Sequence, residues 1–227
     1  MILHVIQICY NSNCMKKTIN IPIDSLQLEG ILVVPEGARG LVIFSHGAGS
    51  SRLSPRNNFV ADVLNEVGIA TLLFDLLTEE EDRIYQNRFD IPRLTKRLVA
   101  VTKWADSQPD LRKLSIGFFG ASTGAASALN AAAELGKSVK AVVSRGGRPD
   151  LSMDHLPDVR AATLLIVGGF DDVVIDMNQR ALEALQCEKK LEIVPEATHL
   201  FEEPGKLEVA ATLAREWFKR YLTQSST

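Results

Sequence analysis

The sequence predicts an α/β fold in which a mostly parallel sheet of about eight strands is covered by helices on both faces. Two observations predict it. Short apolar runs alternate along the chain with segments of helical periodicity. Most of the runs are apolar throughout, as is typical of parallel strands buried on both faces. The expected strands cover residues 17–23, 26–34, 41–45, 69–75, 114–119, 139–144, 164–167 and 190–194.

Composition indicates an ordinary globular chain. The 227 residues are 46% hydrophobic and 23% charged, with a formal net charge of −3. That length is enough to bury a sizeable core, and we expect residues 15–227 to form a single domain. Residues 1–14 match nothing that follows, and two interpretations stay open for them: an extra edge strand, or an extension upstream of a chain that starts at Met15.

Charge, apolar run length and cysteine count indicate which partners and which compartment to expect. A slightly acidic chain without a basic run predicts neither a nucleic-acid partner nor a membrane partner, and a homodimer is compatible with the sequence. Its apolar stretches are far short of a membrane span, and the N-terminus lacks the features of a signal peptide. Three cysteines, Cys9, Cys14 and Cys187, are odd in number and unlike any zinc spacing. We therefore expect a cytoplasmic protein in a reducing compartment.

The N-terminal segments read as a hairpin followed by a buried strand. Apolar residues flank Asp24 and Ser25, which predicts a β-turn, and Pro22 suits an edge strand. Turn residues 35–40 lead into the strand at 41–45.

Four long helices are expected between or after the strands. They cover residues 57–67, 92–106, the segment after Ser122, and 206–221, with a shorter helix at 177–185. Asp90 is placed to cap the helix at 92–106, and Trp217 lies on the apolar stripe of the last one. The charged residues 78–83 are expected to form a solvated loop or a helix end.

The strongest motif is a G-x-S-x-G pentapeptide between a strand and an alanine-rich helix. It reads Gly120-Ala121-Ser122-Thr123-Gly124. A sharp strand-to-helix turn exposes the central serine at the carboxyl end of the sheet, and the turn tolerates only small neighbours. Ser122 is therefore the candidate nucleophile, with the start of the following helix facing whatever it attacks.

A second glycine-rich loop, residues 46–51, follows the strand at 41–45. Such a loop can hold a backbone N–H towards the nucleophile, so we expect an oxyanion hole made by the amides of Ala48 and Thr123. The alternative is a merely tight turn. His46 precedes the serine in the chain, which favours a structural role for it at the strand end.

An acid and a histidine follow Ser122 in the order that this architecture uses. Asp171 comes directly after a strand and His199 after the next one, and both strands end at the same edge as Ser122. The carboxylate would orient the imidazole, and the imidazole would take the serine proton. Asp172 is the alternative acid.

The loop after the strand at 139–144 is short, which leaves no room for a large lid. An open pocket of this kind favours small soluble substrates. Arg145 lies at the strand end, where its guanidinium could bind a substrate carboxylate through two hydrogen bonds. The alternative is an ion pair with Asp150 or another loop acid.

These motifs resemble those of the α/β-hydrolase superfamily, and within it the dienelactone hydrolase-like group. The resemblance covers roughly residues 17–222 and is carried by SHGAGSSR (45–52), GFFGASTGAA (117–126), SRGGRPDL (144–151), LLIVGGFDD (164–172) and ATHLFEEPG (197–205). The family's Gly-Gly-x-Asp pattern falls on residues 168–171, which favours Asp171 as the acid. The enzymes that name the group use a cysteine nucleophile, whereas this chain has Ser122.

The resemblance implies a hydrolase that needs no metal and no organic cofactor. With serine as the nucleophile, a simple small-molecule ester is the expected substrate. A thioesterase, an acyltransferase or a lactone hydrolase would use the same three residues. A non-catalytic binding module on the same fold is the alternative of a different class.

Overall fold

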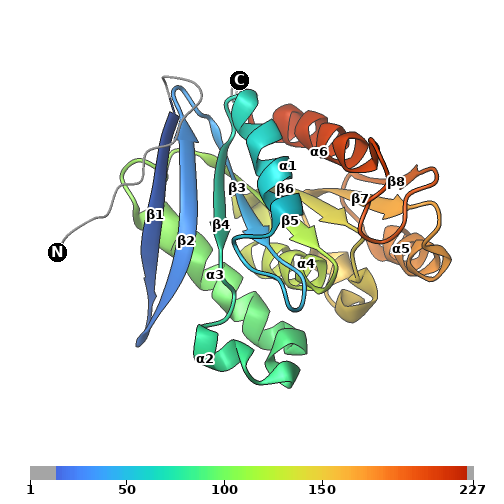
Figure 1. The fold of residues 1–227 in the computed structure, drawn as a ribbon, viewed down its shortest axis with the longest axis horizontal. Helices are drawn as coiled ribbons and strands as arrows, with labels where there is room; N and C mark the ends of the chain where they lie inside the picture. Colours follow the sequence, from blue (N-terminus) through green and yellow to red (C-terminus); the bar gives the residue numbers. More distant parts are fainter. Residues whose placement is uncertain (1–13, 224–227) are drawn as a thin grey trace.

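The computed structural model describes residues 14–223, whose strands form one eight-stranded sheet in the order β1-β2-β4-β3-β5-β6-β7-β8 (Figure 1). The strands are β1 (Cys14–Ile23), β2 (Leu26–Pro35), β3 (Gly40–Ser45), β4 (Ala70–Phe74), β5 (Ser115–Ala121), β6 (Val139–Arg145), β7 (Ala162–Gly168) and β8 (Lys189–Val194). β1 pairs antiparallel with β2, and β2 with β4, whereas all other pairs are parallel. The predicted fold class is confirmed.

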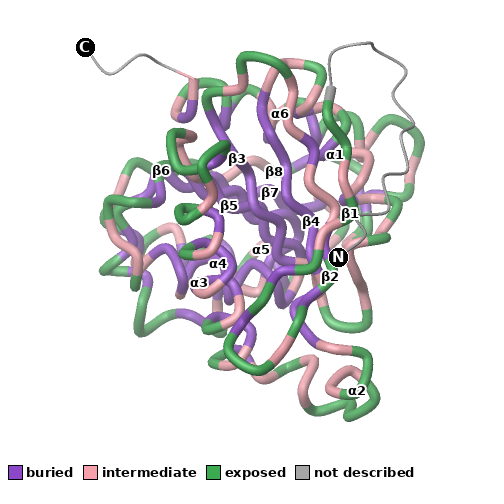
Figure 2. The backbone as a smooth tube through the Cα atoms, turned by 90° about the vertical axis from the view of Figure 1, so that its left-hand side faces the viewer, coloured by how far each residue is buried: buried purple, intermediate pink, exposed green. Residues whose placement is uncertain are grey.

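Helices cover both faces of this sheet. The elements are α1 (Pro55–Glu66), α2 (Glu79–Asp82), η1 (Tyr85–Phe89), α3 (Ile91–Ser107), α4 (Thr123–Leu135), η2 (Gly136–Ser138), η3 (Pro149–Ser152), η4 (Leu156–Asp158), α5 (Asp172–Ala184) and α6 (Lys206–Leu222). One apolar cluster joins α1 and α6 to the sheet, and a second joins α3, α4 and α5 to its other face. Buried backbone accordingly concentrates in the central strands (Figure 2).

Local sequence accounts for the ends of several elements. The side chain of Asp90 accepts a hydrogen bond from the N–H of Arg93 and so caps α3 as predicted. Residues 78–83 contain the short helix α2, where Thr78 and Glu81 form a capping box. Helix α5 begins at Asp172, well before the predicted residue 177, because the turn after β7 is short and the helix follows it at once.

The predicted hairpin is confirmed at the sheet edge. β1 has β2 as its neighbour, and Pro22 faces Gln27 in the register. A proline is tolerated there because an outer strand does not need every N–H for the sheet. Cys14 begins β1, and the remainder of the predicted extension, residues 1–13, lies outside the described residues.

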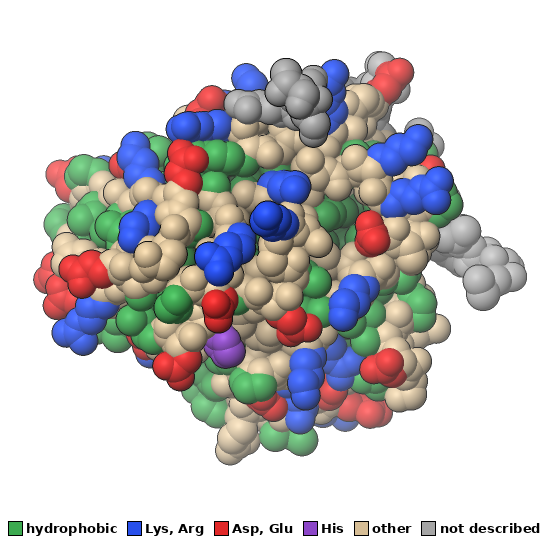
Figure 3. Space-filling view, turned by 180° about the vertical axis from the view of Figure 1, so that it is seen from behind, with side chains coloured by type: hydrophobic (Ala, Val, Ile, Leu, Met, Phe, Trp, Pro, Cys, Tyr) green, Lys and Arg blue, Asp and Glu red, His purple; other side chains and the backbone are tan. Residues whose placement is uncertain are grey.

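The face of the molecule opposite to the one seen in Figure 1 carries no large patch of a single charge among its described residues. Acidic and basic side chains are interspersed over it (Figure 3). Among residues 14–223, no helix combines the length and the apolar character needed to cross a bilayer.

Parallel strands bring their following loops to one edge of the sheet. β3, β5, β6, β7 and β8 all run in the same direction, so the residues after them share the carboxyl edge. Those residues include Ala48, Ser122, Thr123, Asp171 and His199, and Arg145 is the last residue of β6 at the same edge.

Candidate active site

Ser122 lies on a strained turn between β5 and α4. Its backbone has φ 51° and ψ −122°, a region that residues with a Cβ rarely occupy. A Cβ at Gly120 would lie 2.4 Å from the Cα of Ala125, and one at Gly124 would lie 2.1 Å from the carbonyl oxygen of Ser45. Both glycines are therefore required by close backbone packing, as the motif predicts.

His199 bridges the other two predicted residues. Its Nδ1 lies 2.6 Å from Oδ2 of Asp171, and its Nε2 lies 3.3 Å from Oγ of Ser122. Because an ionised carboxylate only accepts, Nδ1 carries the proton and Nε2 is left to accept from the serine hydroxyl. The structure thus brings Ser122, Asp171 and His199 together, and the carboxylate that contacts the imidazole is that of Asp171 and not of Asp172.

The glycine-rich loop after β3 approaches the serine closely. A Cβ at Gly47 would lie 3.2 Å from Cβ of Ser122, so this loop forms one wall of the site. The N–H of Ala48 donates to Oγ1 of Thr123 at 2.9 Å. The two residues predicted for the oxyanion hole are therefore neighbours, but the amide of Ala48 is occupied by the Thr123 hydroxyl. The sequence pattern gave no sign of this hydrogen bond between the Ala48 amide and the Thr123 hydroxyl.

His46 holds the turn behind this loop. Its Nε2 accepts from the N–H of Leu76 at 3.1 Å, and its Nδ1 lies 3.0 Å from the carbonyl oxygen of Gly47. A carbonyl only accepts, so Nδ1 carries the proton in the neutral ring. Desolvation by burial lowers the pKa of His46, which keeps the ring neutral. Both ring nitrogens are thus engaged by the backbone, in agreement with the structural role expected.

Arg145 is buried, with 6% of its surface exposed. Its guanidinium lies over the ring of Phe201, 5.7 Å from the centroid, and its Nε has no hydrogen-bond partner. Desolvation and the nearby Arg56 lower the pKa of Arg145 to about 10. The ion pair with Asp150 belongs instead to Arg148, whose Nε and Nη2 each lie 2.8 Å from a carboxylate oxygen. The predicted alternative for Arg145, a pair with Asp150, is therefore wrong.

Two acids of residues 78–83, Glu81 and Asp82, form ion pairs with arginines of neighbouring helices. Oε1 of Glu81 accepts from Nη2 of Arg97 at 2.7 Å, and Asp82 accepts from Nε and Nη2 of Arg88. These pairs fasten α2 to α3 and η1. Among residues 14–223, no three His, Cys, Asp or Glu side chains are grouped as a metal ion would require.

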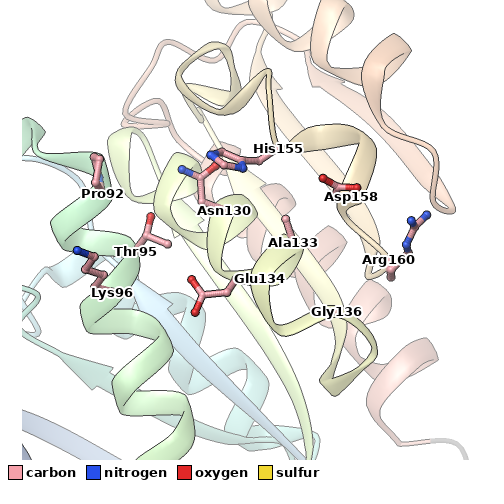
Figure 4. Close-up of a pocket in the computed structure, with 10 residues that line it drawn as sticks. All are labelled: Pro92, Thr95, Lys96, Asn130, Ala133, Glu134, Gly136, His155, Asp158 and Arg160. Carbon is pink, nitrogen blue, oxygen red and sulfur yellow. The ribbon is translucent and has the colours of Figure 1, made fainter.

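A cavity of about 580 Å³ lies away from the serine, between α3, α4 and the segment around η4 (Figure 4). Its lining includes Thr95 and Lys96 from α3, Asn130 and Glu134 from α4, and His155. Its lining does not include Ser122, Asp171 or His199. The candidate site is a half-buried assembly at the sheet edge, where the side chain of His199 is 36% exposed and that of Asp171 18%.

Comparison with known proteins gives concordant matches. Residues 28–224 match the sequence model of the dienelactone hydrolase family. The crystal structure of a dienelactone hydrolase from Anabaena variabilis is 54% identical, with a TM-score of 0.90, over 92% of this chain and 99% of that one. The protein Est1E from Butyrivibrio proteoclasticus shares the fold at 18% identity, with a TM-score of 0.77, over 89% of this chain and 98% of that one.

A protein of Mycobacterium tuberculosis, provisionally named a phosphoribosyl transferase, is 58% identical over 193 residues. The match covers 85% of this chain but only 44% of the mycobacterial protein. The chain thus spans less than half the length of that relative.

Proposed function

Because this chain belongs to the dienelactone hydrolase family, we propose that it is a hydrolase that cleaves a small soluble ester through an acyl-enzyme on Ser122. The observation that carries the proposal is the position of His199, with one ring nitrogen on Asp171 and the other facing Ser122. That arrangement can remove the serine proton and hold the resulting charge.

Two acyl-transfer steps follow from this geometry. Oγ of Ser122 attacks the ester carbonyl while Nε2 of His199 takes its proton, and Asp171 stabilises the imidazolium. The tetrahedral intermediate then expels the alcohol, which receives that proton. In the second step, water loses a proton to His199 and attacks the acyl-enzyme. The carboxylic acid leaves as the proton returns to Ser122.

The oxyanion would be held by two amides. The N–H of Thr123, at the first position of α4, has no partner within the helix and benefits from the positive end of the helix dipole. The N–H of Ala48 would be the second donor once the Thr123 hydroxyl turns away from it. Each such donor is typically worth about 3 kcal/mol of transition-state stabilisation.

The size of the β6–β7 connection, the serine nucleophile and Arg145 indicate the class of substrate. The connection between β6 and β7 contains only the short turns η3 and η4, and His199 is accessible, which suits small soluble molecules. Serine in place of the cysteine of the enzymes that name the group favours ordinary esters. Arg145 would select an ester that carries a carboxylate, because it is a buried cation for which residues 14–223 supply no acid partner within ion-pair distance.

Thioester or lactone hydrolysis and acyl transfer to another acceptor would pass through the same acyl-enzyme. Comparison of acyl donors and acceptors separates them. The name of the mycobacterial relative does not carry over, since more than half of that protein lies outside the match.

The decisive experiment is mass spectrometry of the intact protein after incubation with a fluorophosphonate. We expect one adduct on Ser122, abolished in Ser122→Ala and in His199→Ala, and hydrolysis of short-chain p-nitrophenyl esters by the wild type. A folded wild-type protein that forms no adduct and cleaves none of these esters would overturn the proposal and favour a binding module.

A further inference from the structure

The strained backbone of Ser122 is held by the loop that follows β6. The N–H of Ser122 donates to the carbonyl of Arg145 at 3.2 Å, and the carbonyl of Ser122 accepts from the N–H of Arg148 at 3.1 Å. Both backbone polar groups of Ser122 are thus bonded to a single four-residue segment, residues 145–148, which starts at the last residue of β6. We call this segment the clamp loop.

The clamp loop also supports the histidine. Gly146 has φ 52°, and a Cβ there would lie 3.1 Å from the carbonyl oxygen of His199 and 3.5 Å from both Nδ1 and Cε1 of its ring. Its N–H donates to the carbonyl of Ile166 at 2.7 Å, which ties the loop to β7. A shift of the clamp loop would therefore displace the backbone of Ser122 and the packing under His199 together.

Asn178 fixes the clamp loop from within. This residue of α5 has none of its surface exposed, and its Nδ2 donates to the carbonyls of Gly147 at 3.1 Å and Val174 at 2.8 Å. On its other side, Gly147 packs so tightly that a Cβ would lie 2.6 Å from Cβ of Ala125 in α4. Asn178 is thus the side chain that joins α5, which begins next to Asp171, to the loop that holds Ser122.

Stability alone does not explain an amide at this position. Oδ1 of Asn178 is buried without a hydrogen-bond partner, which is costly. A leucine of similar volume would remove that unpaired acceptor, but it would also lose the donor to Gly147.

We propose that Asn178 is a positioning residue for acyl transfer, an inference that rests on the proposed function. By donating a hydrogen bond to the Gly147 carbonyl, it keeps the clamp loop in the conformation that orients Ser122 and supports His199. It acts through the loop and touches no reacting atom.

The test compares Asn178→Leu with Asn57→Leu. Asn57, in α1, is a matched control because it is 2% exposed and also has a buried Oδ1 without a partner. We expect Asn178→Leu to lower kcat and the rate of fluorophosphonate labelling by roughly 10- to 100-fold, with KM little changed, because small misplacements of reacting groups cost rates of this order. Asn57→Leu should keep wild-type rates per folded molecule, whatever its Tm.

A second variant, Asn178→Asp, gives a readout that a purely structural role would not move. A protonated carboxyl can donate to the Gly147 carbonyl, whereas a carboxylate would repel it, and burial raises the pKa of such an acid. The ratio of Asn178→Asp to wild-type kcat should therefore rise as the pH falls from about 9 to 6, with folding checked by circular dichroism at each pH.

The outcomes are distinguishable. Wild-type rates in folded Asn178→Leu, or a ratio for Asn178→Asp that does not change with pH, would overturn the inference and leave the proposed function intact. A wild type that neither labels nor hydrolyses esters would overturn the proposed function itself. If Asn178→Leu fails to fold, the pH dependence of Asn178→Asp decides.

Discussion

Replacement of Ser122 by glycine should remove the reactive group and yet make the protein more stable than the alanine variant. The backbone at φ 51° and ψ −122° costs about 1–3 kcal/mol for a residue that has a Cβ. Glycine removes that cost but loses about 0.5–1 kcal/mol more conformational freedom on folding than alanine. Mid-range values of the two terms, about 2 and about 0.75 kcal/mol, give an expected difference of about 1.25 kcal/mol in favour of Ser122→Gly over Ser122→Ala.

Alanine is the matched control because it keeps the Cβ and, like glycine, loses the contact of Ser122 with Nε2 of His199. At about 2–4 °C per kcal/mol for a chain of this size, Ser122→Gly should melt roughly 2.5–5 °C above Ser122→Ala. Thermal and urea unfolding, followed by circular dichroism, measure the difference. A glycine variant that is equal to or less stable than the alanine variant would refute the argument that this turn stores strain.

Three further predictions concern other residues. Asp171→Asn should lower kcat by about 10³- to 10⁴-fold with KM little changed, since an amide no longer holds the imidazole in the productive tautomer. Steady-state kinetics measure the loss, and a decrease in kcat below about tenfold would contradict this role of Asp171. Arg145→Ala should raise KM for monoesters of dicarboxylic acids at least tenfold more than for neutral esters of equal length, and equal effects on both would contradict a carboxylate site. His46→Gln should flatten the dependence of Tm on pH. Because the pKa of His46 is lower in the folded state, the folded protein loses stability as the pH falls below about 6.5, the pKa of an unfolded-state histidine. The wild-type Tm should therefore drop more between pH 7.5 and 5 than the Tm of the variant. Parallel Tm profiles would show that His46 does not contribute to this dependence.

The nucleophile turn could be predicted because its requirements are local. Gly120 and Gly124 are needed by backbone atoms a few residues away or on the adjacent strand β3, and a short motif records such needs directly. The order of Ser122, Asp171 and His199 was informative for a related reason. Parallel strands bring their ends to one edge, so position after a strand is enough to place a residue.

The partners of individual side chains could not be predicted in this way. The ion pair of Asp150 with Arg148 and not with Arg145 depends on which side of the loop each arginine faces. The hydroxyl of Thr123 on the amide of Ala48 joins residues 75 positions apart. Asn178 gave no signal either, because a single asparagine within a helix carries no pattern.

The start of α5 was misplaced for a different reason. The periodicity of residues 177–185 is clear, but residues 172–176 mix acidic and β-branched side chains, and their helical state depends on the turn after β7. Tertiary context thus extended a helix whose core the sequence had indicated.

The end of α6 has a consequence for how this unit can be combined with others. Leu222 packs against Gly40, and the carbonyl of Thr223 accepts from Arg39, so the last described residues lie at the amino end of β3. Ser45, at the other end of that strand, packs on the nucleophile turn, about 17 Å away for a strand of this length. A tag, tether or second domain attached beyond Thr223 would emerge on the side opposite the reactive serine. Covalent fusion at this end should therefore leave the approach to Ser122 open.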